Sequence, residues 1–250
     1  MKTEPYVEAA EGPDGEPILA LVAGGAYQSA TYLGKRRFEP VFAYHRAFDC
    51  MFQAGIDVRD VLMLGGGGYS YPKHFAIAHP ACRMDVVEAD PAVTCLAKER
   101  FFLQEVLDGL DDPDRLRLIT AEGRAYLDSC PKTYDAIIND CFSGTRPARS
   151  LMTVEAARAV ARCLTPDGLY LANAVSEREG CDVSILCAAA SALAHVFAHV
   201  QMLPCSDEGF SAEDNYLLAA SNRPFNLPGA IPFPEELRGC ALHDERASAL

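Results

Sequence analysis

The chain has 250 residues, of which 50% are hydrophobic, and its formal net charge is −13. This length can hold one large α/β domain with a buried core, and the composition argues against disorder. The negative charge argues against a nucleic-acid partner, because binding to phosphates needs clustered Lys and Arg. We find no apolar stretch long enough to span a bilayer and no signal peptide, so we expect no membrane partner and a cytoplasmic location.

The ten cysteines give no sign of a metal site. None of them form a C-x-x-C pair, and no Cys/His cluster has the spacing of a zinc site. Several, such as Cys95 and Cys163, lie inside apolar runs. We therefore expect reduced cysteines in the core and no bound metal.

The N-terminal part of the chain predicts a β-hairpin that follows a polar lead-in over residues 1–17. Residues 18–22 and 26–33 are short runs of β type, and two glycines separate them. Residues 41–54 carry apolar side chains mostly at helical spacing, which predicts a helix packed on a sheet.

From residue 60 onward, strand patterns and helix patterns alternate regularly. The predicted strands are 61–64, 84–88, 116–120, 134–139, 168–175, 200–204 and 215–221. The predicted helices are 72–79, 92–107, 124–130, 153–164 and 183–198. The alternation predicts an α/β fold with a doubly wound, mostly parallel seven-stranded sheet. The last two strands have no helix between them, which indicates one antiparallel strand at that end.

These elements divide the chain into three segments. Residues 1–38 hold the lead-in and the hairpin, and residues 39–222 form the sheet domain, which we expect to bind a nucleoside. Residues 223–250 form a Pro-containing tail that we expect to be irregular. Ligands of such sheets bind beyond the carboxyl ends of the strands, so we expect the site there.

A glycine turn and an acid mark the first part of that site. The apolar run 61–64 leads directly into Gly65, Gly66 and Gly67, and the next predicted strand ends at Glu88, followed by Ala89. Glycines let the backbone approach a ligand, and an acid at this place can accept two ribose hydroxyls. Such glycines also serve tight turns for structural reasons, but the combination with Glu88 predicts a ribose-bearing cofactor.

The residues after the glycines indicate a cofactor without phosphates. A dinucleotide fingerprint requires a third glycine where this chain has Ser70, and Tyr69, Tyr71 and Pro72 surround that position. A bulky aromatic turn is poorly suited to a pyrophosphate. We therefore predict S-adenosylmethionine or its decarboxylated form.

Two further strand ends bring polar residues to the same crevice. Glu122 and Gly123 follow the third strand, and Glu122 could either accept from an adenine amino group or cap the next helix. Asp140, Cys141 and Ser143 follow the fourth strand. Asp140 lies at the mouth of an apolar strand, where it could act as a general base, hold a cationic centre, or make only structural hydrogen bonds.

Together these motifs resemble those of the spermidine synthase family of aminopropyltransferases over residues 18–222. The glycine turn is similar to the family's Gly-Gly-Gly-Asp-Gly-Gly, and residues 87–91 are similar to its Val-Glu-Ile-Asp-Pro. Residues 122–127 resemble its Asp-Gly-Arg-x-Phe-Leu. The resemblance implies a class I methyltransferase-like fold, an S-adenosylmethionine-type donor and a small amine acceptor.

The resemblance also implies roles for individual residues. Glu88 would hold the ribose, and Glu122 stands where the family has its adenine-contacting Asp. Gln28, Tyr44 and His45 are similar to family elements near the donor and the amine. Family members often assemble through such N-terminal hairpins, which implies a homodimer.

Three positions depart from the family pattern. Asp140 is kept as the first acid of the family's Asp-x-x-Asp, but Ser143 replaces the second, which is the base of the family. Arg46 replaces the Glu of Tyr-His-Glu, and Gly68 replaces the Asp of the glycine turn. We take Asp140, Ser143 and Tyr44 as the candidate catalytic residues.

Three functions are compatible with this pattern. The first is aminopropyl transfer from decarboxylated S-adenosylmethionine to an amine, as in polyamine biosynthesis. The second is methyl transfer from intact S-adenosylmethionine to a small acceptor, which Arg46 and Ser143 motivate. The third is a non-catalytic nucleoside binder that has kept the pocket and lost the second Asp.

Overall fold

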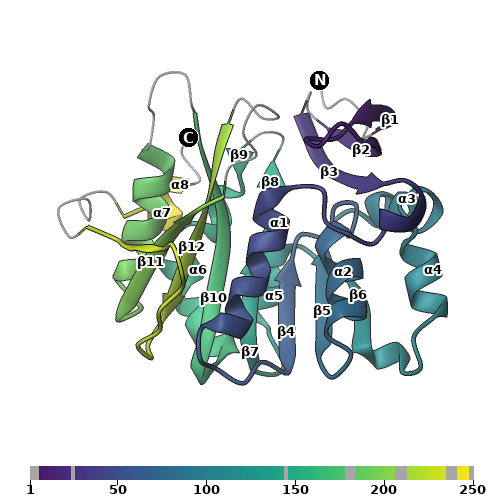
Figure 1. Ribbon diagram of the computed structural model, residues 1–250. Coiled ribbons are helices and arrows are strands. Elements are labelled where there is room, and N and C mark those ends of the chain that lie inside the picture. Colours follow the sequence, from purple (N-terminus) through teal and green to yellow (C-terminus); the bar gives the residue numbers. More distant parts are fainter. Residues whose placement is uncertain are drawn as a thin grey trace.

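The computed structural model describes residues 6–23, 26–143, 146–177, 184–205, 213–234 and 241–247, and a large sheet forms its centre (Figure 1). Within these residues the sheet has eight strands in the order β13-β11-β12-β10-β7-β4-β5-β6. Their bounds are β4 Asp60–Leu64, β5 Arg83–Glu88, β6 Leu116–Thr120, β7 Tyr134–Asn139, β10 Leu164–Glu177, β11 His199–Pro204, β12 Glu213–Ser221 and β13 Ile231–Pro232.

The strand directions confirm the predicted fold class. Strands β10, β7, β4, β5 and β6 run parallel to one another, and β12 runs antiparallel to both β10 and β11. The predicted number of strands was wrong by one, because β13 in the tail pairs with Gln201 and Met202 of β11. A strand of two residues, one of them Pro232, carries too little pattern to be recognised in the sequence.

The parallel strands form because both of their faces are covered. In β4, Val61 and Met63 belong to the core on one side of the sheet, whereas Leu62 and Leu64 belong to the core on the other side. A strand buried on both faces is apolar throughout, which is why these strands were recognisable in the sequence.

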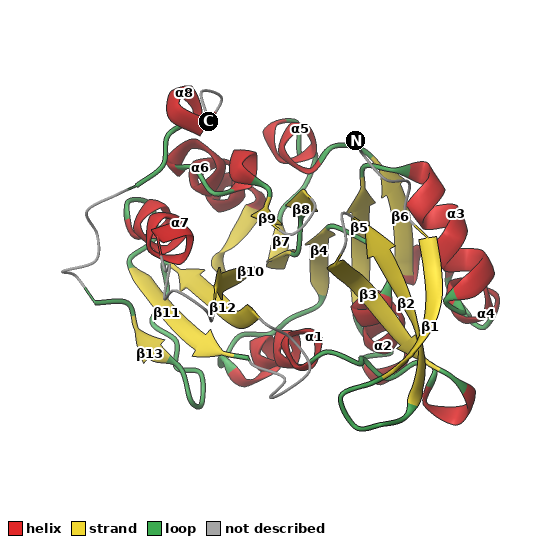
Figure 2. Cartoon of the chain, turned by 90° about the horizontal axis from the view of Figure 1, so that it is seen from above, coloured by secondary structure: helices red, strands yellow, loops and turns green. Residues whose placement is uncertain are grey.

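Helices cover both faces of the sheet, with α1 and α2 on one side and α5, α6 and α7 on the other (Figure 2). The α-helices are α1 Ala43–Ala47, α2 Ser70–Ala78, α3 Pro91–Arg100, α4 Leu103–Asp108, α5 Gly123–Asp128, α6 Val154–Cys163, α7 Ser184–Ala194 and α8 Asp244–Ala247. The 3₁₀ helices are η1 Gly34–Arg36, η2 Phe48–Gln53, η3 Pro113–Arg115 and η4 Arg149–Leu151. In the described part of the chain, no helix has both the length and the apolar character needed to cross a membrane.

Two predicted helices are interrupted in the structure. The helix predicted over 92–107 is divided into α3 and α4, because Phe102 adopts a left-handed conformation with φ of +61°. This turn lets Phe101 and Leu103 both be fully buried. The helix predicted over 41–54 begins as α1 and continues as the 3₁₀ helix η2.

The N-terminal segment forms a separate antiparallel sheet near the carboxyl ends of the parallel strands (Figure 1). The predicted hairpin is present as β2 Pro17–Ala23 and β3 Ala26–Tyr32. A third strand, β1 Tyr6–Glu11, pairs with β2 in the region that we expected to be a polar lead-in. Its six residues are all exposed or half-buried, and two of them are glutamates.

The cysteines mostly follow the prediction. Cys50, Cys82, Cys163 and Cys205 are buried free thiols, and the described residues contain no disulfide. Cys130, Cys141 and Cys187 are half-buried, and Cys95 is exposed on α3. Its apolar neighbours in the sequence point to other faces of that helix.

Candidate functional site

The glycine turn after β4 approaches the end of β7 very closely. Gly65 has φ of +90°, and a Cβ atom at this residue would lie 2.5 Å from the carbonyl oxygen of Asp140. The backbone amide of Asp140 donates to the carbonyl of Leu64 at 2.8 Å. Only glycine suits this conformation and this spacing, so the turn holds Asp140 at the edge of the sheet.

Glu88 is fixed at the end of β5 by backbone amides of the same turn. One carboxylate oxygen accepts from the amides of Gly66 at 2.9 Å and Gly67 at 3.1 Å, and the other accepts from the amide of Asp90 at 3.0 Å. A carboxylate has about four acceptor positions, so it can still accept from a ligand. The predicted ribose acid and the predicted glycine turn therefore form one unit.

Asp140 is the centre of a second polar group. Its carboxylate accepts from the side-chain amide of Asn173 at 2.8 Å, and its other oxygen lies 3.2 Å from Nε2 of His45. The side chains of Asp140 and His45 are only 10% and 4% exposed. The structure thus joins residues from β7, α1 and β10, and two of the three were predicted site residues.

Aromatic side chains hold the His45 ring. Tyr44 packs on it with ring centroids 4.2 Å apart, and Phe42 stacks on it at 5.7 Å. Nδ1 of His45 is buried and has no hydrogen-bond partner among the described residues. A buried nitrogen without a partner costs free energy, so this atom is suited to meet a polar group of a ligand.

Cys141 and Gly123 lie against each other beside Asp140. A Cβ at Gly123 would lie 3.5 Å from Sγ of Cys141. Burial raises the pKa of the Cys141 thiol well above its ordinary value, and the negative charges of Asp140, Glu88 and Glu122 act in the same direction. The thiol therefore stays protonated and takes no part as a nucleophile.

Glu122 performs one of its two predicted roles. Its carboxylate accepts from the backbone amide of Ala125 at 2.7 Å and caps α5, and the residue is exposed. The predicted contact to an adenine stays a prediction. Asp90 and Thr153 likewise cap α3 and α6 with their side chains.

The remaining predicted residues lie around this group. A Cβ at Gly67 would be 3.9 Å from the carbonyl oxygen of Gln28, so β3 passes directly beside the glycine turn. Ala89 is exposed next to Glu88. Ser143 belongs to the short β8 Phe142–Ser143, which pairs with β9 Arg146–Pro147, but its side chain lies outside the description.

Two departures from the family pattern have clear local causes. A Cβ at Gly68 would lie 2.7 Å from Oγ of Ser29, so β3 occupies the place of a side chain there. The Arg46 guanidinium donates to the carbonyls of Pro40 and Val41, at 3.1 and 2.6 Å, beside the start of its own helix. Tyr71, one of the aromatic residues that follow the glycines, is fully buried in the core.

The sequence analysis missed the asparagines of the site. Asn173 is buried in β10 and positions Asp140, and buried Asn139 donates to the hydroxyl of Tyr170 at 2.9 Å while accepting from the amide of Cys141 at 3.2 Å. Both asparagines interrupt apolar strands, which is the signal that could have revealed them. They also line a small cavity between β10 and α7.

A doubly wound sheet with a carboxylate fixed over a glycine turn, at the carboxyl ends of its parallel strands, defines a protein of the methyltransferase-like fold class. The family model described as "Spermine/spermidine synthase domain" matches residues 42–205. The chain therefore belongs to this family, as the sequence motifs indicated.

Similar proteins support this assignment. Polyamine aminopropyltransferase 2 of Hyperthermus butylicus is 35% identical over 124 residues, which are 47% of this chain and 39% of that protein. The chain thus spans less than half the length of this curated relative. The structure of a probable spermidine synthase from Corynebacterium glutamicum has a TM-score of 0.76 at 23% identity, covering 98% of this chain and 95% of that one. A spermidine synthase in complex with the transition state analogue AdoDATO has a TM-score of 0.65 at 22% identity, covering 100% and 82%.

Proposed function

We propose that this protein transfers an aminopropyl group from decarboxylated S-adenosylmethionine to a small amine. The observation that carries the proposal is the polar group of Asp140, His45 and Asn173 next to the glycine turn that holds Glu88. The family membership and the name of the aminopropyltransferase relative support the same reaction.

In this proposal, Glu88 binds the two hydroxyls of the donor ribose. The backbone amides of Gly66 and Gly67 hold the carboxylate in place before the donor arrives, so little conformational entropy is lost on binding. Gln28, whose carbonyl oxygen would lie 3.9 Å from a Cβ at Gly67, and Glu122 with Gly123 at the start of α5 would complete the donor site.

The transfer itself needs a neutral amine in line with the bond that breaks. The amine nitrogen attacks the propyl carbon next to the sulfonium, the carbon–sulfur bond breaks, and its electrons neutralise the sulfur as methylthioadenosine leaves. The amine loses one proton, which the Asp140–His45 pair accepts. Asn173 keeps the Asp140 carboxylate oriented toward this task.

The reaction does not require an acid at position 143 if Asp140 and His45 together take the proton. Ser143 would then serve as a hydrogen-bonding residue of the acceptor site, with Tyr44 as an apolar wall. Methyl transfer from intact S-adenosylmethionine is the alternative function, which the replacement of two family acids by Arg46 and Ser143 favours.

A product assay by mass spectrometry separates these functions. The protein is offered each of the two donors with a mixed pool of amines. Methylthioadenosine with an aminopropylated amine supports the proposal, whereas S-adenosylhomocysteine would identify a methyltransferase. If both donors bind without any turnover, the protein is a binder.

A pair of variants tests the role of Asp140. We expect Asp140→Asn to lower kcat by about 10²–10⁴-fold, because the proton acceptor is lost. Asp57→Asn is the matched control, since this carboxylate is 80% exposed and pairs only with exposed Arg59. Equal activity of the two variants would contradict the proposed base. The homodimer that the family resemblance implies is tested separately by light scattering.

A further inference from the structure

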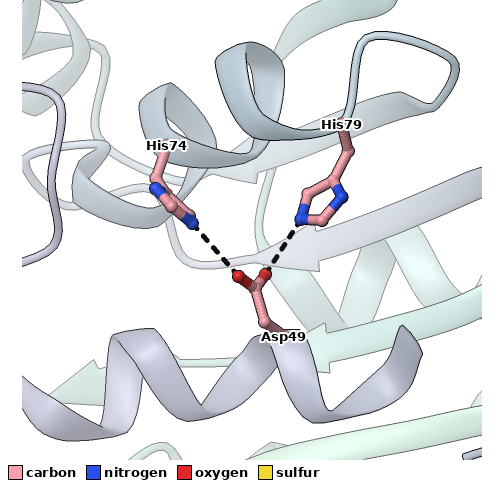
Figure 3. Close-up of side chains that lie close together, drawn as sticks. All are labelled: Asp49, His74 and His79. Carbon is pink, nitrogen blue, oxygen red and sulfur yellow. Dashed lines mark hydrogen bonds and ion pairs between the residues drawn. The ribbon is translucent and has the colours of Figure 1, made fainter. Parts of the chain in front are cut away.

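Two histidines and an aspartate converge outside the proposed donor site. His74 of α2 and His79, which ends that helix, both point toward Asp49 of η2 (Figure 3). Nε2 of His74 lies 3.1 Å from one carboxylate oxygen of Asp49, and Nε2 of His79 lies 3.2 Å from the other. One possible ligand atom from each residue lies within 4.8 Å of the other two.

These separations suit a metal ion. A tetrahedral ion with ligand distances of about 2.0–2.1 Å has ligand atoms about 3.3 Å apart. The two short N···O distances involve different oxygens of Asp49, and one possible ligand atom from each residue already lies within 4.8 Å of the other two. Imidazole nitrogen combined with carboxylate oxygen is a ligand set that Zn²⁺ and similar divalent ions accept. The three side chains are 23–31% exposed, so an ion and its water ligands can reach them.

Neighbouring side chains hold Asp49 and His79 in position, as the residues around metal ligands commonly do. The hydroxyl of Tyr71, itself fully buried, donates to Asp49 at 2.9 Å. The Phe52 ring stacks on His79 with centroids 3.9 Å apart and an interplanar angle of 21°. A hydrogen bond to the ligating carboxylate and a fixed imidazole ring are both features of metal sites.

We propose that Asp49, His74 and His79 form a binding site for a divalent transition-metal ion, with Zn²⁺ as the ion to test first. The histidines are on α2 and the carboxylate is on η2, so a bound ion would connect the two elements. The Nε2 protons that face Asp49 leave on binding, either to solvent or to Nδ1 of the same ring, and the freed lone pairs bind the ion. This proposal does not depend on the aminopropyl transfer.

The prediction of no metal from the sequence overlooked this group. His74 and His79 have four residues between them, a spacing that occurs among zinc ligands, but the carboxylate of Asp49 is 25 residues away from His74. Only the packing of η2 against α2 brings the three together. We therefore propose a metal site where the sequence predicted none.

Titration of the full-length reduced protein with ZnCl₂ tests the proposal by calorimetry. We expect one ion per chain, and at least about 100-fold weaker binding in His74→Gln and in Asp49→Asn. Tyr71→Phe keeps all three ligands and is expected to weaken binding about 10-fold. His199→Gln is the control, because His199 lies on β11 at the other end of the sheet.

The free thiols require a second readout, because cysteines also bind Zn²⁺. Titration with Co²⁺ distinguishes the two, since thiolate ligands add an intense charge-transfer band that nitrogen and oxygen ligands do not. Cobalt bound with that band, or retained by the Asp49 and His74 variants, would overturn the proposal. Crystals of the unmodified protein soaked in ZnCl₂ give a test without variants. Their anomalous scattering should peak between the three residues, and its absence there would refute the site.

Discussion

Gly65→Ala is the substitution for which the structure gives the sharpest expectation. The new Cβ would lie 2.5 Å from the carbonyl oxygen of Asp140 and 2.9 Å from its carbon, both of them backbone atoms that cannot rotate away. The φ of +90° adds about 1–2 kcal/mol for a residue with a Cβ, and the forced backbone shift adds about 1–3 kcal/mol. The free energy of unfolding should therefore fall by about 2–5 kcal/mol.

Gly15→Ala separates the two contributions. Gly15 has a similar φ of +78°, but a Cβ there would meet nothing within 4 Å, so only the conformational cost of about 1–2 kcal/mol applies. Urea unfolding followed by circular dichroism gives both free energies. Equal losses in the two variants would show that the glycine turn does not approach Asp140 as closely as described.

Three further substitutions test the site and the core. Glu88→Gln should weaken donor binding at least about 10-fold by calorimetry, because its amide NH₂ cannot accept hydrogen bonds, whereas exposed Glu99→Gln should leave binding unchanged. Lys73 is buried and donates to three oxygen acceptors, and burial lowers the pKa of its ammonium group to about 7 in the folded protein. The ordinary lysine pKa of 10.5 applies to the unfolded chain, so between pH 7 and 10.5 the unfolded chain holds the ammonium proton and the folded protein does not. Wild-type stability should therefore rise relative to Lys73→Met as the pH increases from 7 to 8.5 in urea unfolding, and parallel curves would contradict this. Asp85→Asn should lower the free energy of unfolding by about 1–3 kcal/mol in the same assay, because buried Asp85 accepts two hydrogen bonds from one arginine. The control Asp112→Asn, at a side chain that is 42% exposed, should lower it by at most about 1 kcal/mol.

The sequence predicted the parallel strands well because burial on two faces leaves an unmistakable pattern. Each of β4, β5 and β7 was found within one residue of its observed bounds. The strand at residues 6–11 was not predicted, because it belongs to a small exposed sheet and its polar and apolar residues alternate only loosely. The break at Phe102 depends on where two aromatic rings find space in the core, which no local pattern contains.

The candidate site likewise contains residues that could be predicted from the sequence and residues that could not. Glu88, Asp140 and the glycines follow strand ends, and the topology of a doubly wound sheet brings strand ends together. His45 entered the prediction only through the family resemblance, since a short helix gives no reason for its ring to point at Asp140. Asn173 escaped notice because its partner is 33 residues away in the sequence.

In the glycine turn, Gly68 stands where the family has an Asp, and the residues around the turn support its conformation. Tyr69 adopts a left-handed conformation with φ of 54°, which costs about 1–2 kcal/mol for a residue with a side chain. Its ring is fully buried, and its hydroxyl is 2.9 Å from that of Thr94, which offsets this cost. The same ring would lie 2.7 Å from a Cβ at Gly66, and Ser29 excludes one at Gly68. The aromatic ring and the glycines therefore require one another, and together they place the amides of Gly66 and Gly67 against Glu88.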